Sequence, residues 1–597
     1  EITFKDGNEK INTVINGSID LGGGDNKLTI SEGTVINGEI ITGSGNNTLI
    51  LGKENLNRSA EQEEINIFNN IKGFDETSIK GNVTIFDKTY VFNKDLSVVE
   101  GKLTAELGDI TLENGSNLIL KIDDTQKEGD KITGHALHGN TGSISSNGGK
   151  LLLDVGKLSA GTIVNFGGTE LTDSMKGNEV NYSSGITLDS LSLLHNIEKI
   201  SNEDIKVTIK GNLPIMPYPD NINYNQLNKI YQGILSTDQV KYFNIVSKEN
   251  LSTFLGYLNN IYAGSPYSYS SELSRKSAGM FRDIVTDNQF KSDTGKWMIY
   301  GGLTHVDGGT KDTYYGKGYY TYDIGSSDMD ADTKITGAYM LGEYGVSDTL
   351  TSGVVIGGNK LKSDLSNGSK VDGSAMYLGA YAKKYIGNLK VTAGAGFQYG
   401  DYDADRMAVN KVASDETKAV MKYSDNYNDI TYDIYLNGRY SHQVGDNLFL
   451  EPYATLSYTY IDQDGANEGS KTLAIETDSK SFDYTVGKVG VDLKKVIPHE
   501  KGKSTFSAGV SYTKILDGAD EEHITGRFKD GSNFDILVAH KNEHSIGLNA
   551  KYALELENGV LFDVKGTYSV ERDSHNNSGK NKTKGEWIIG AGIGYKF

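Results

Sequence analysis

The chain has 597 residues, of which 37% are hydrophobic, with 72 Gly, six Pro and a net charge of −20. This composition excludes collagen and most disordered classes, and the acidic balance disfavours nucleic acid or another polyanion as a partner. Cys is absent, which excludes disulfides and thiolate metal sites, and the chain contains no run of about 18 apolar residues that would predict a transmembrane helix.

Tyrosine divides the chain into two parts. Of the 36 Tyr, only Tyr90 and Tyr182 precede Pro217. Gly and Phe occur on both sides of that proline, so the change is specific to Tyr. We interpret it as a sign of two halves that fold in different solvents.

Residues 1–212 read as short β segments that are interrupted by Gly and Asn. The stretch GGGDNKLTI at Gly22 to Ile30 recurs as GSGNNTLIL at Gly43 to Leu51, 21 residues later. A repeat of this length suits one coil of a right-handed parallel β-helix or a similar solenoid, with Gly and Asn at the corners. We therefore predict a β-solenoid for residues 1–212.

The solenoid half carries two weak metal signals. The repeat half-matches the calcium-binding nonapeptide G-G-x-G-x-D-x-U-x, but Asn26 stands where Asp is required, so ordinary β-helix corners are the favoured interpretation. His135 and His138 form an H-x-x-H pair without a nearby third ligand motif, which is more often ordinary surface. No G-D-S-G, G-x-S-x-G or H-E-x-x-H motif occurs, so we predict no metal, no cofactor and no catalytic residue.

Residues 213–264 read as a proline-rich connector followed by a helical region. Three of the six prolines lie in LPIMPYP, from Leu213 to Pro219, where they end the solenoid. From Asn223 to Tyr262 apolar residues recur at helical spacing. A small helical domain, or helices packed on the end of the solenoid, is the expected structure.

Residues 265–295 are predicted to hold a pore helix. The segment SSELSRKSAGMFRDIVTD has a reasonable N-cap in Ser271 and runs to Asp287, a length of about 27 Å at 1.5 Å per residue. It carries Arg275, Lys276, Arg282 and Asp283 beside Ser and Gly. Such a polar helix is poorly suited to a dry core and would suit a water-lined pore of matching length.

Residues 296–597 contain segments that alternate apolar and polar side chains. Val391, Ala393, Ala395, Phe397 and Tyr399, for example, share one face of one segment. The last segment, WIIGAGIGYKF, has one apolar face with aromatic residues at both ends. Twelve strands are predicted near 297–306, 332–346, 349–361, 373–386, 388–402, 428–443, 447–461, 480–496, 503–516, 541–557, 559–572 and 586–597.

A soluble β-sandwich also alternates, so the connections must decide between the two architectures. Short turns alternate with long connections, which are expected at 307–331, 362–372, 403–427, 462–479, 517–540 and 573–585. Strict alternation places all long loops on one side, as in transmembrane barrels with long extracellular loops and short periplasmic turns. We therefore predict a mainly β chain whose C-terminal half is a 12-stranded antiparallel transmembrane barrel with a helix in its pore.

Charged residues on the inner face of this barrel are candidates for contact with the helix. They are tolerated in a wet lumen, whereas at the lipid midplane each would cost about 2–4 kcal/mol. Specific pairs with the helix and a solvated lumen without pairs both remain open. The lumen candidates are Asp433, Arg439, Glu451, Lys551, Glu555, Asp563, Lys565 and Glu571.

The aromatic residues at the barrel seam form a second set of candidates. Trp297 and Trp587, the only two Trp, begin the first and the last strand. These strands are antiparallel neighbours in a closed barrel, so the two indoles are expected at opposite membrane interfaces.

The C-terminal half resembles a monomeric (type Va) autotransporter. The resemblance lies in SPYSYSSELSRKSAGMFRD before the first strand, in the twelve-strand block, and in the terminal aromatic residue of GYKF; it covers about Ser265 to Phe597. The Lys- and Asn-rich repeats are also similar to those of large fusobacterial adhesins of this type. The resemblance implies assembly by the barrel-assembly machinery, which would read the C-terminal strand with Tyr595 and Phe597, and a helix left in the pore after export of a passenger.

Some members of this family cut themselves at an Asn-Asn pair in the helix. When the sequences are aligned on RKSAGMFRD, the matching position here is near Ser270-Ser271, and Asn259-Asn260 lies too far upstream. We therefore expect an uncut passenger.

The favoured function is an outer-membrane translocator that exports its own passenger and anchors it at the cell surface as an adhesin. Its expected partners are outer-membrane lipid, the barrel-assembly machinery and a host or bacterial surface receptor. One alternative is an enzymatic passenger, a protease or lipase, with its active site upstream of Glu1. Another is a porin-like channel, which the plugging helix disfavours, and a trimeric autotransporter is disfavoured because its anchor contributes only about four strands per chain.

Overall fold

The structure is a computed structural model that covers most of the chain. It describes residues 2–4, 13–52, 64–85, 90–92, 95–100, 103–105, 109–113, 117–122, 127–128, 131–133, 137–139, 143–147, 150–165, 187–201, 204–214, 224–312, 329–539, 543–572 and 585–597. The chain divides into two compact units. The first comprises Glu1–Pro214, Asp238–Leu251 and Val412–Glu416, and the second comprises Ile215–Thr237, Ser252–Lys411 and Thr417–Phe597.

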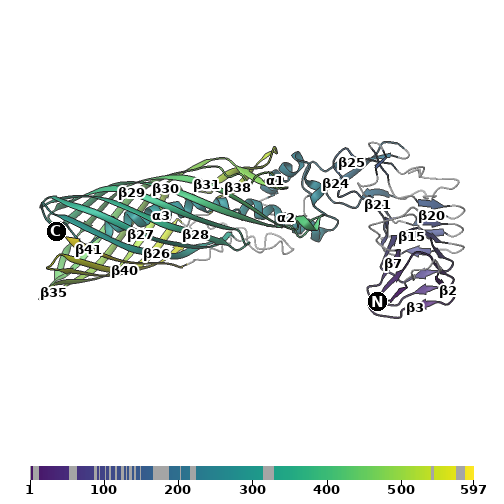
Figure 1. Ribbon diagram of the computed structural model, residues 1–597, viewed down its shortest axis with the longest axis horizontal. Coiled ribbons are helices and arrows are strands. Elements are labelled where there is room, and N and C mark those ends of the chain that lie inside the picture. The colour runs from purple at the N-terminus through teal and green to yellow at the C-terminus, as the bar shows by residue number, and fades with distance from the viewer. Residues whose placement is uncertain are drawn as a thin grey trace. The chain divides into compact units, whose positions relative to one another are not determined.

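The first unit is built from short parallel strands that stack coil upon coil, as Figure 1 shows in purple and blue. One sheet holds β1 (Ile2–Phe4), β4 (Lys27–Ile30), β7 (Thr48–Gly52), β10 (Glu76–Lys80), β13 (Asp95–Glu100), β16 (Asn117–Lys121), β21 (Lys150–Asp154) and β23 (Thr187–Ser190). A second holds β2 (Thr13–Ile15), β5 (Thr34–Ile36), β8 (Ile65–Ile67), β11 (Val83–Ile85), β14 (Leu103–Ala105) and β19 (Leu137–Gly139). Two smaller sheets hold β3 (Ile19–Asp20), β6 (Ile40–Ile41) and β9 (Ile71–Lys72), and β12 (Tyr90–Phe92), β15 (Asp109–Glu113) and β20 (Ser143–Asn147).

The sequence repeat corresponds to one coil of this solenoid. Leu28 of β4 pairs in parallel register with Leu49 of β7, its counterpart 21 residues later. Both side chains, with Ile30 and Leu51, are buried in the core that runs through the coils. Apolar residues at alternate positions of β4 and β7 thus point inward, and the predicted parallel β-solenoid is confirmed.

Asparagine side chains bind the corners of successive coils together. Asn26 donates through Nδ2 to the carbonyl oxygen of Gly24 at 2.8 Å, and Asn47 does the same to Gly43 at 3.0 Å. The backbone N–H of Asn26 donates to Asn47 Oδ1 at 3.2 Å, and the backbone N–H of Asn47 donates to Asp75 Oδ2 at 2.8 Å. The side-chain NH2 group of each Asn therefore bonds corner carbonyl oxygens of its own coil, and the backbone N–H bonds link one coil to the next.

No cluster of metal-ligating side chains occurs among the residues that the structure describes. His135 and the side chain of His138 lie outside those residues.

The C-terminal end of the solenoid has a sheet of mixed direction with a buried histidine. The sheet holds β17 (Lys127–Glu128), β18 (Lys131–Thr133), β22 (Ile163–Asn165), β24 (His195–Lys199) and β25 (Asp204–Ile209). His195 is buried, with Nδ1 2.8 Å from Ser192 Oγ and Nε2 3.3 Å from Leu158 O. Burial disfavours its charged form and lowers the pKa of His195 to about 4.

The middle of the chain is helical. The helices there are α1 (Tyr224–Ser236), η1 (Val240–Tyr242), α2 (Lys248–Ala263), η2 (Pro266–Ser268) and α3 (Ser270–Asp287). The short η3 (Glu416–Lys418) lies later in the chain, among the barrel strands. α1 buries Leu227, Ile230, Tyr231 and Ile234 on one face, as its spacing predicted. Among the described helices, none combines the length and the apolar character that crossing a membrane requires.

The second unit is a closed antiparallel barrel, with α3 inside the ring of strands in Figure 1. β26 pairs with both β27 and β41, and this pairing closes the sheet. β31 and β32 both pair with β33 and follow each other in the chain, so they count as one strand, and the described wall has twelve strands. The strands are β26 (Trp297–Asp312), β27 (Met329–Ser347), β28 (Leu350–Leu365), β29 (Lys370–Ile386), β30 (Leu389–Val409), β31 (Val420–Tyr440), β32 (His442–Gly445), β33 (Leu448–Gln463), β35 (Lys480–His499), β36 (Gly502–Asp517), β39 (His544–Leu556), β40 (Val560–Arg572) and β41 (Gly585–Lys596).

The connections at one end of the barrel differ from the predicted long loops. β28 and β29 extend until only 366–369 joins them, because Leu361, Leu365 and Val371 are buried on the inner side of the extended strands. Two of the predicted loops contain a small antiparallel sheet of β34 (Ile475–Thr477), β37 (His523–Phe528) and β38 (Asn533–Leu537). α1 packs on this sheet, where Lys229 pairs with Asp535 at 2.7 Å.

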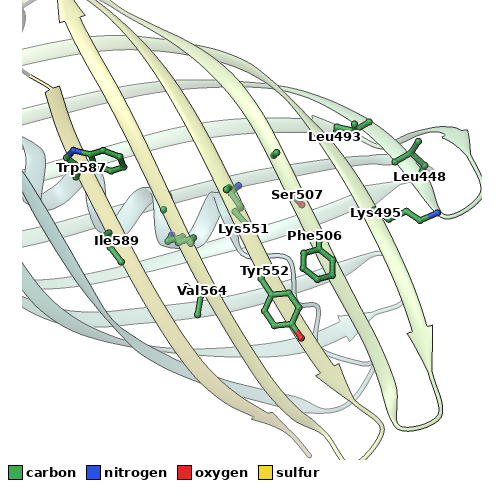
Figure 2. Close-up of a pocket in the computed structure, with 14 residues that line it drawn as sticks. Leu448, Leu493, Lys495, Phe506, Ser507, Lys551, Tyr552, Val564, Trp587 and Ile589 are labelled. Carbon is green, nitrogen blue, oxygen red and sulfur yellow. The ribbon is translucent and has the colours of Figure 1, made fainter.

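The barrel turns its large apolar side chains outward. Figure 2 shows Phe506, Tyr552, Val564, Trp587 and Ile589 on the outer wall. These residues line a hollow of about 720 Å³. The inward residues of the same strands are mainly Tyr, Ser, Thr and charged groups. This pattern, apolar outside and polar inside, is that of a barrel in lipid.

Tyrosine side chains fill part of the lumen by covering inward-facing glycines. A Cβ at Gly396 would overlap the hydroxyl end of Tyr377, and one at Gly592 would overlap that of Tyr300. Large phenol rings can therefore lie flat on the inner wall. This packing gives a physical reason for the rise in Tyr after Pro217.

Candidate functional site

The candidate site is the contact between α3 and the inner wall of the barrel. α3 begins at Ser270, directly after η2, and its N-cap is Tyr269 without a side-chain cap bond. Ser271 was expected to be the cap but lies within the first helical turn. The helix ends at Asp287 because Asn288 adopts an extended conformation.

A row of serines forms the face of α3 that lies closest to β28–β33. Ser270, Ser274 and Ser277 are separated by four and three residues, so they share one side of the helix, and all three are fully buried. Small side chains allow the helix to approach the wall while their hydroxyls satisfy polar groups there. Sequence reasoning noted these serines only as polar residues and missed their common face.

Each of these serines has hydrogen-bond partners on the wall. Ser277 Oγ donates to Gln398 Oε1 and accepts from Asn359 Nδ2, both at 2.8 Å. Ser274 Oγ contacts Tyr402 and Asp429. Ser270 Oγ donates to Gln463 Oε1 and accepts from Tyr427 Oη, both at 3.0 Å.

The second half of α3 also packs through apolar groups. The Phe281 ring stacks on Tyr377 with 4.6 Å between ring centroids and 12° between planes. A Cβ at Gly357 would overlap Phe281, so glycine is needed for the ring to reach the wall. Ala278, Ile284 and Val285 are buried in the same cluster.

Charged residues hold the side of α3 that faces away from the serine row. Arg282 Nη1 is 2.8 Å from Asp433 Oδ1, and Asp283 is 3.7 Å from Lys488 Nζ. Lys276 pairs with Glu586 of β41 and lies 3.8 Å from Glu571 of β40.

Arg275 behaves differently from the other helix cations. It pairs within the helix with Glu272 at 2.6 Å, and its guanidinium lies 5.7 Å from the ring centroid of Tyr484. Its ion pair with Glu272 is therefore local, and it contacts the wall through an aromatic ring.

A network of charges surrounds the C-terminal end of α3. Arg439 lies 2.8 Å from Asp492, 3.5 Å from Asp287 at the end of the helix and 3.5 Å from Glu451. Lys551 lies 3.7 Å from Asp287 and 3.5 Å from Asp492.

Two of the predicted lumen residues have other partners, and a third has no ion pair. Glu555 pairs with Lys503 at 3.2 Å and with Lys596 at 2.5 Å, both on the barrel wall. Asp563 accepts a hydrogen bond from the Tyr300 hydroxyl. Lys565 forms no ion pair within 4.0 Å in the part of the chain that the structure describes.

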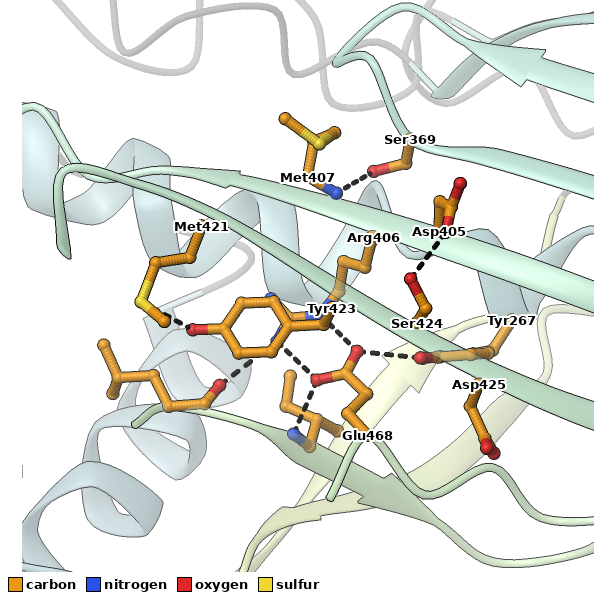
Figure 3. Close-up of polar contacts among 12 residues, drawn as sticks. Tyr267, Ser369, Asp405, Arg406, Met407, Met421, Tyr423, Ser424, Asp425 and Glu468 are labelled. Atoms are coloured by element: carbon orange, nitrogen blue, oxygen red, sulfur yellow. Dashed lines mark hydrogen bonds and ion pairs between the residues drawn. The ribbon is translucent and has the colours of Figure 1, made fainter. Parts of the chain in front are cut away.

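The opposite mouth of the barrel is held by a buried arginine–glutamate pair that sequence reasoning missed. Figure 3 shows Arg406 of β30 meeting Glu468 through two parallel hydrogen bonds, each 2.7 Å long. Glu468 also accepts from Tyr267 Oη at 2.7 Å, and Arg406 lies 4.2 Å from the Tyr423 ring centroid. A connection of the barrel, a strand and the segment before α3 are thus joined at one point.

This pair had no recognisable sequence signal. Arg406 follows an acidic stretch and Glu468 lies in a predicted loop, so both residues read as solvated. Only the inward turn of 464–474 brings Glu468 into a buried position.

The predicted aromatic residues lie along the seam between β26 and β41. The backbone of Trp297 exchanges hydrogen bonds with Phe597, at 3.1 and 3.0 Å. Trp587 pairs with Asp307, ten residues further along β26 than Trp297. Both indoles, Tyr595 and Phe597 are exposed on the outer surface.

Comparison with known families identifies the C-terminal region of the chain. Residues 312–567 match the model of the autotransporter beta-domain family. An extracellular serine protease of Serratia marcescens is 26% identical over 201 residues, which are 33% of this chain and 17% of that protein. The serine protease sat autotransporter of Escherichia coli O6:H1 is 27% identical over 143 residues, 22% of this chain and 10% of that protein.

Solved structures similar to this chain include two autotransporter translocator domains. The translocator domain of autotransporter NalP from Neisseria meningitidis is 15% identical, with a TM-score of 0.41 over 56% of this chain and 99% of that one. The β-domain of the Bordetella autotransporter BrkA is 15% identical, with a TM-score of 0.35 over 51% of this chain and 100% of that one. The chain spans less than a fifth of the length of the curated relatives named above.

Proposed function

We propose, from the premise that the C-terminal domain of this chain is an autotransporter β-domain, that the chain delivers its own solenoid to the cell surface and keeps it there as an adhesin. The barrel is an outer-membrane translocator, and its outward apolar face lies in lipid. The solenoid is the passenger, and a surface receptor is its proposed partner.

The observation that carries this proposal is the polar contact along the whole length of α3. Hydrogen bonds to the wall begin at Ser270, and the last ion pairs are at Asp287. A chain that passes through the lumen during export must exchange its contacts with the wall along the way. Polar groups on a hydrated inner wall allow this exchange, because water can replace each hydrogen bond while the chain moves. The bonded helix supports a state in which export has ended and the chain is locked in place.

The same contact supports an uncut passenger. Ser270 and Ser271, at the position where some family members carry the cleaved Asn pair, are buried at the start of the helix. Asn259 lies within α2, outside α3. The proposed chain therefore remains a single polypeptide from solenoid to barrel.

Assembly of the barrel is proposed to use the barrel-assembly machinery. The C-terminal strand presents Trp587, Tyr595 and Phe597 outward, and its last residue is bonded to the first strand at the seam. Such a strand can be recognised before the barrel closes.

The test is expression of the chain, with a secretion leader, in cells that have an outer membrane. An antibody against residues 13–52 should label intact cells, and the boiled sample should give one band of about 65 kDa, near the 64.9 kDa of the whole chain. The unboiled sample should run faster, as closed barrels do. Separate passenger and barrel bands would contradict the uncut anchor, and labelling only after lysis would contradict export.

A second candidate is a passenger with protease activity, because the curated relatives are named as serine proteases. Because the expected active site lies upstream of Glu1, the test incubates the protein as its native cells make it with casein and with a serine-reactive fluorophosphonate. Labelling of a single serine would favour this candidate, and the absence of labelling and of casein cleavage would favour the adhesin.

A further inference from the structure

A polar cavity lies at the end of the lumen where the short turns connect the strands. It has a volume of about 280 Å³ and is lined by residues from the end of α3, the β29–β30 turn and the facing wall. Short turns mark the periplasmic end of outer-membrane barrels, so this cavity lies at the periplasmic mouth.

The charges around the cavity do not balance. Asp287, Glu451 and Asp492 supply three negative charges, and each is within 3.7 Å of Arg439, Lys494 or Lys551. Those three cations therefore have partners.

Two further cations of the cavity have only neutral partners. Lys390 Nζ is 3.3 Å from the backbone oxygen of Asn288, and Lys291 Nζ is 2.7 Å from that of Asp348. Neither lysine has a carboxylate within 4.0 Å among the described residues. Five cations against three acids leave two positive charges at the cavity.

Two buried hydrogen-bond donors in the cavity also lack an acceptor. Asn288 is only 9% exposed, and its Nδ2 makes no hydrogen bond although its Oδ1 accepts from the Phe290 amide at 2.9 Å. That bond fixes the amide orientation, so Nδ2 is the donor without a partner. Arg439 Nη2 likewise makes no hydrogen bond, although it lies 3.5 Å from Asp287.

We propose that this cavity binds a phosphate-type oxyanion. A partly buried ammonium without a carboxylate, together with buried N–H donors without acceptors, is costly unless a negative acceptor meets them. A tetrahedral oxyanion offers several acceptor oxygens at once, and the cavity has room for it together with water molecules. Lys390 supplies the main charge, and Asn288 Nδ2 and Arg439 Nη2 supply directed donors.

The bound oxyanion would neutralise the excess positive charge at the periplasmic end of α3 and so stabilise the helix inside the barrel. This inference does not depend on what the solenoid does at the surface. Free phosphate and a phospholipid headgroup are the two sources of such an oxyanion, and they share the same chemistry.

The test titrates inorganic phosphate into the purified full chain in lipid-free detergent, against sodium chloride at the same ionic strength. The melting temperature should rise with phosphate and saturate, and chloride should not reproduce the rise. Lys390→Met should weaken the phosphate response at least tenfold, and Asn288→Ala should weaken it by a smaller factor. The control Lys384→Met removes an exposed lysine that donates to Thr349 Oγ1 at 2.9 Å, and it should respond like the parent.

Each result decides the proposal. An equal response to chloride, or an equal phosphate response in Lys390→Met and the parent chain, would overturn it. The faster mobility of the unboiled Lys390→Met chain shows that it has folded, and Asn288→Ala repeats the test without a change in charge. If the phosphate response persists in nanodiscs that contain phosphatidylglycerol, the source is free phosphate; if it disappears there, the lipid headgroup occupies the site.

Discussion

The solenoid and the barrel both alternate side chains along their strands, but they point their apolar residues in opposite directions. Leu28 and Leu49 are buried between coils of the solenoid, whereas Leu436 of the barrel is 53% exposed. The barrel buries Asp433 and Arg406 instead. The same strand pattern therefore serves two solvents, and the polar interior of the barrel leaves room for a helix that binds through hydroxyls and charges.

The largest expected difference between the two regions concerns ion pairs. Arg282→Met leaves the buried Asp433 without its cation and should destabilise the barrel by about 3–5 kcal/mol. Lys72→Met in the solenoid removes an exposed pair with Glu39, 2.7 Å long, and should cost less than about 1 kcal/mol. The temperature at which the unboiled gel species disappears measures the first, and urea-dependent proteolysis of the solenoid measures the second.

The double variant Arg282→Met/Asp433→Leu is the control for this prediction. Removal of both charges should restore most of the stability that Arg282→Met loses. Equal losses in the single and the double variant would contradict the pairing of helix and wall.

Leucine truncation should give the opposite ranking. Leu49→Ala opens a cavity in the solenoid core and should cost about 2–5 kcal/mol. Leu436→Ala only exchanges one lipid-facing side chain for a smaller one, so the barrel should lose less than about 1 kcal/mol. Urea-dependent proteolysis and gel mobility after graded heating are again the measurements; a barrel that loses as much as the solenoid would mean that Leu436 does not face lipid.

Acid should weaken the solenoid through His195. The pKa of His195 is lowered by burial from 6.5 to about 4, so the unfolded chain takes up a proton below pH 6.5 while the folded chain does not. Stability is therefore lost as the pH falls from about 6.5 to 4, and at pH 5.0 the loss should be about 2 kcal/mol relative to pH 7.5. Asp238 opposes and Lys210 assists this shift.

The measurement is urea-dependent proteolysis of the full chain at pH 7.5 and pH 5.0. In His195→Gln the difference between the two pH values should shrink by the same amount. An unchanged difference would show that other groups set the acid sensitivity.

The smallest expected effect concerns the corner asparagines. Asn47 is buried, and Asn47→Ala removes its hydrogen bonds to the carbonyl oxygens of the exposed Gly43 and Gly45, which should cost about 0.5–1.5 kcal/mol of solenoid stability. Asn16→Ala, which removes an exposed side-chain bond with Asn37, should cost less than about 0.5 kcal/mol. Urea midpoints of the two variants give the comparison, and equal midpoints would contradict the buried role of Asn47.

Most of the architecture followed from periodicity. Apolar residues at every second position, together with alternating long and short connections, were enough to predict the barrel. The 21-residue repeat was enough to predict the solenoid, because both architectures depend on the local alternation of side chains. The bounds of α3 also followed from its composition. Strand lengths at the outer mouth did not, since β28 and β29 are extended by packing with distant residues such as Tyr402.

The partners inside the lumen were harder to predict. The alternation of side chains along a strand was enough to place Asp433 and Arg439 on the inner face. Which cation pairs with which acid depends on the closure of the barrel and on the rotation of α3 about its axis, which the sequence does not specify. The serine row could have been found from the spacing of Ser270, Ser274 and Ser277. The Arg406–Glu468 pair could not, because a loop of irregular conformation brings Glu468 to it.

Chemical crosslinking in intact outer membranes tests most directly that α3 is threaded through a closed barrel. The chain contains no Cys, so Ser277→Cys combined with Gln398→Cys introduces the only two thiols. A short bis-methanethiosulfonate should join them, because the native side chains are 2.8 Å apart, and should not join Ser277→Cys to Met376→Cys, which is 67% exposed on the outer wall. A crosslink to position 376, or none to position 398 in a chain with the mobility of a folded barrel, would contradict a helix inside the barrel.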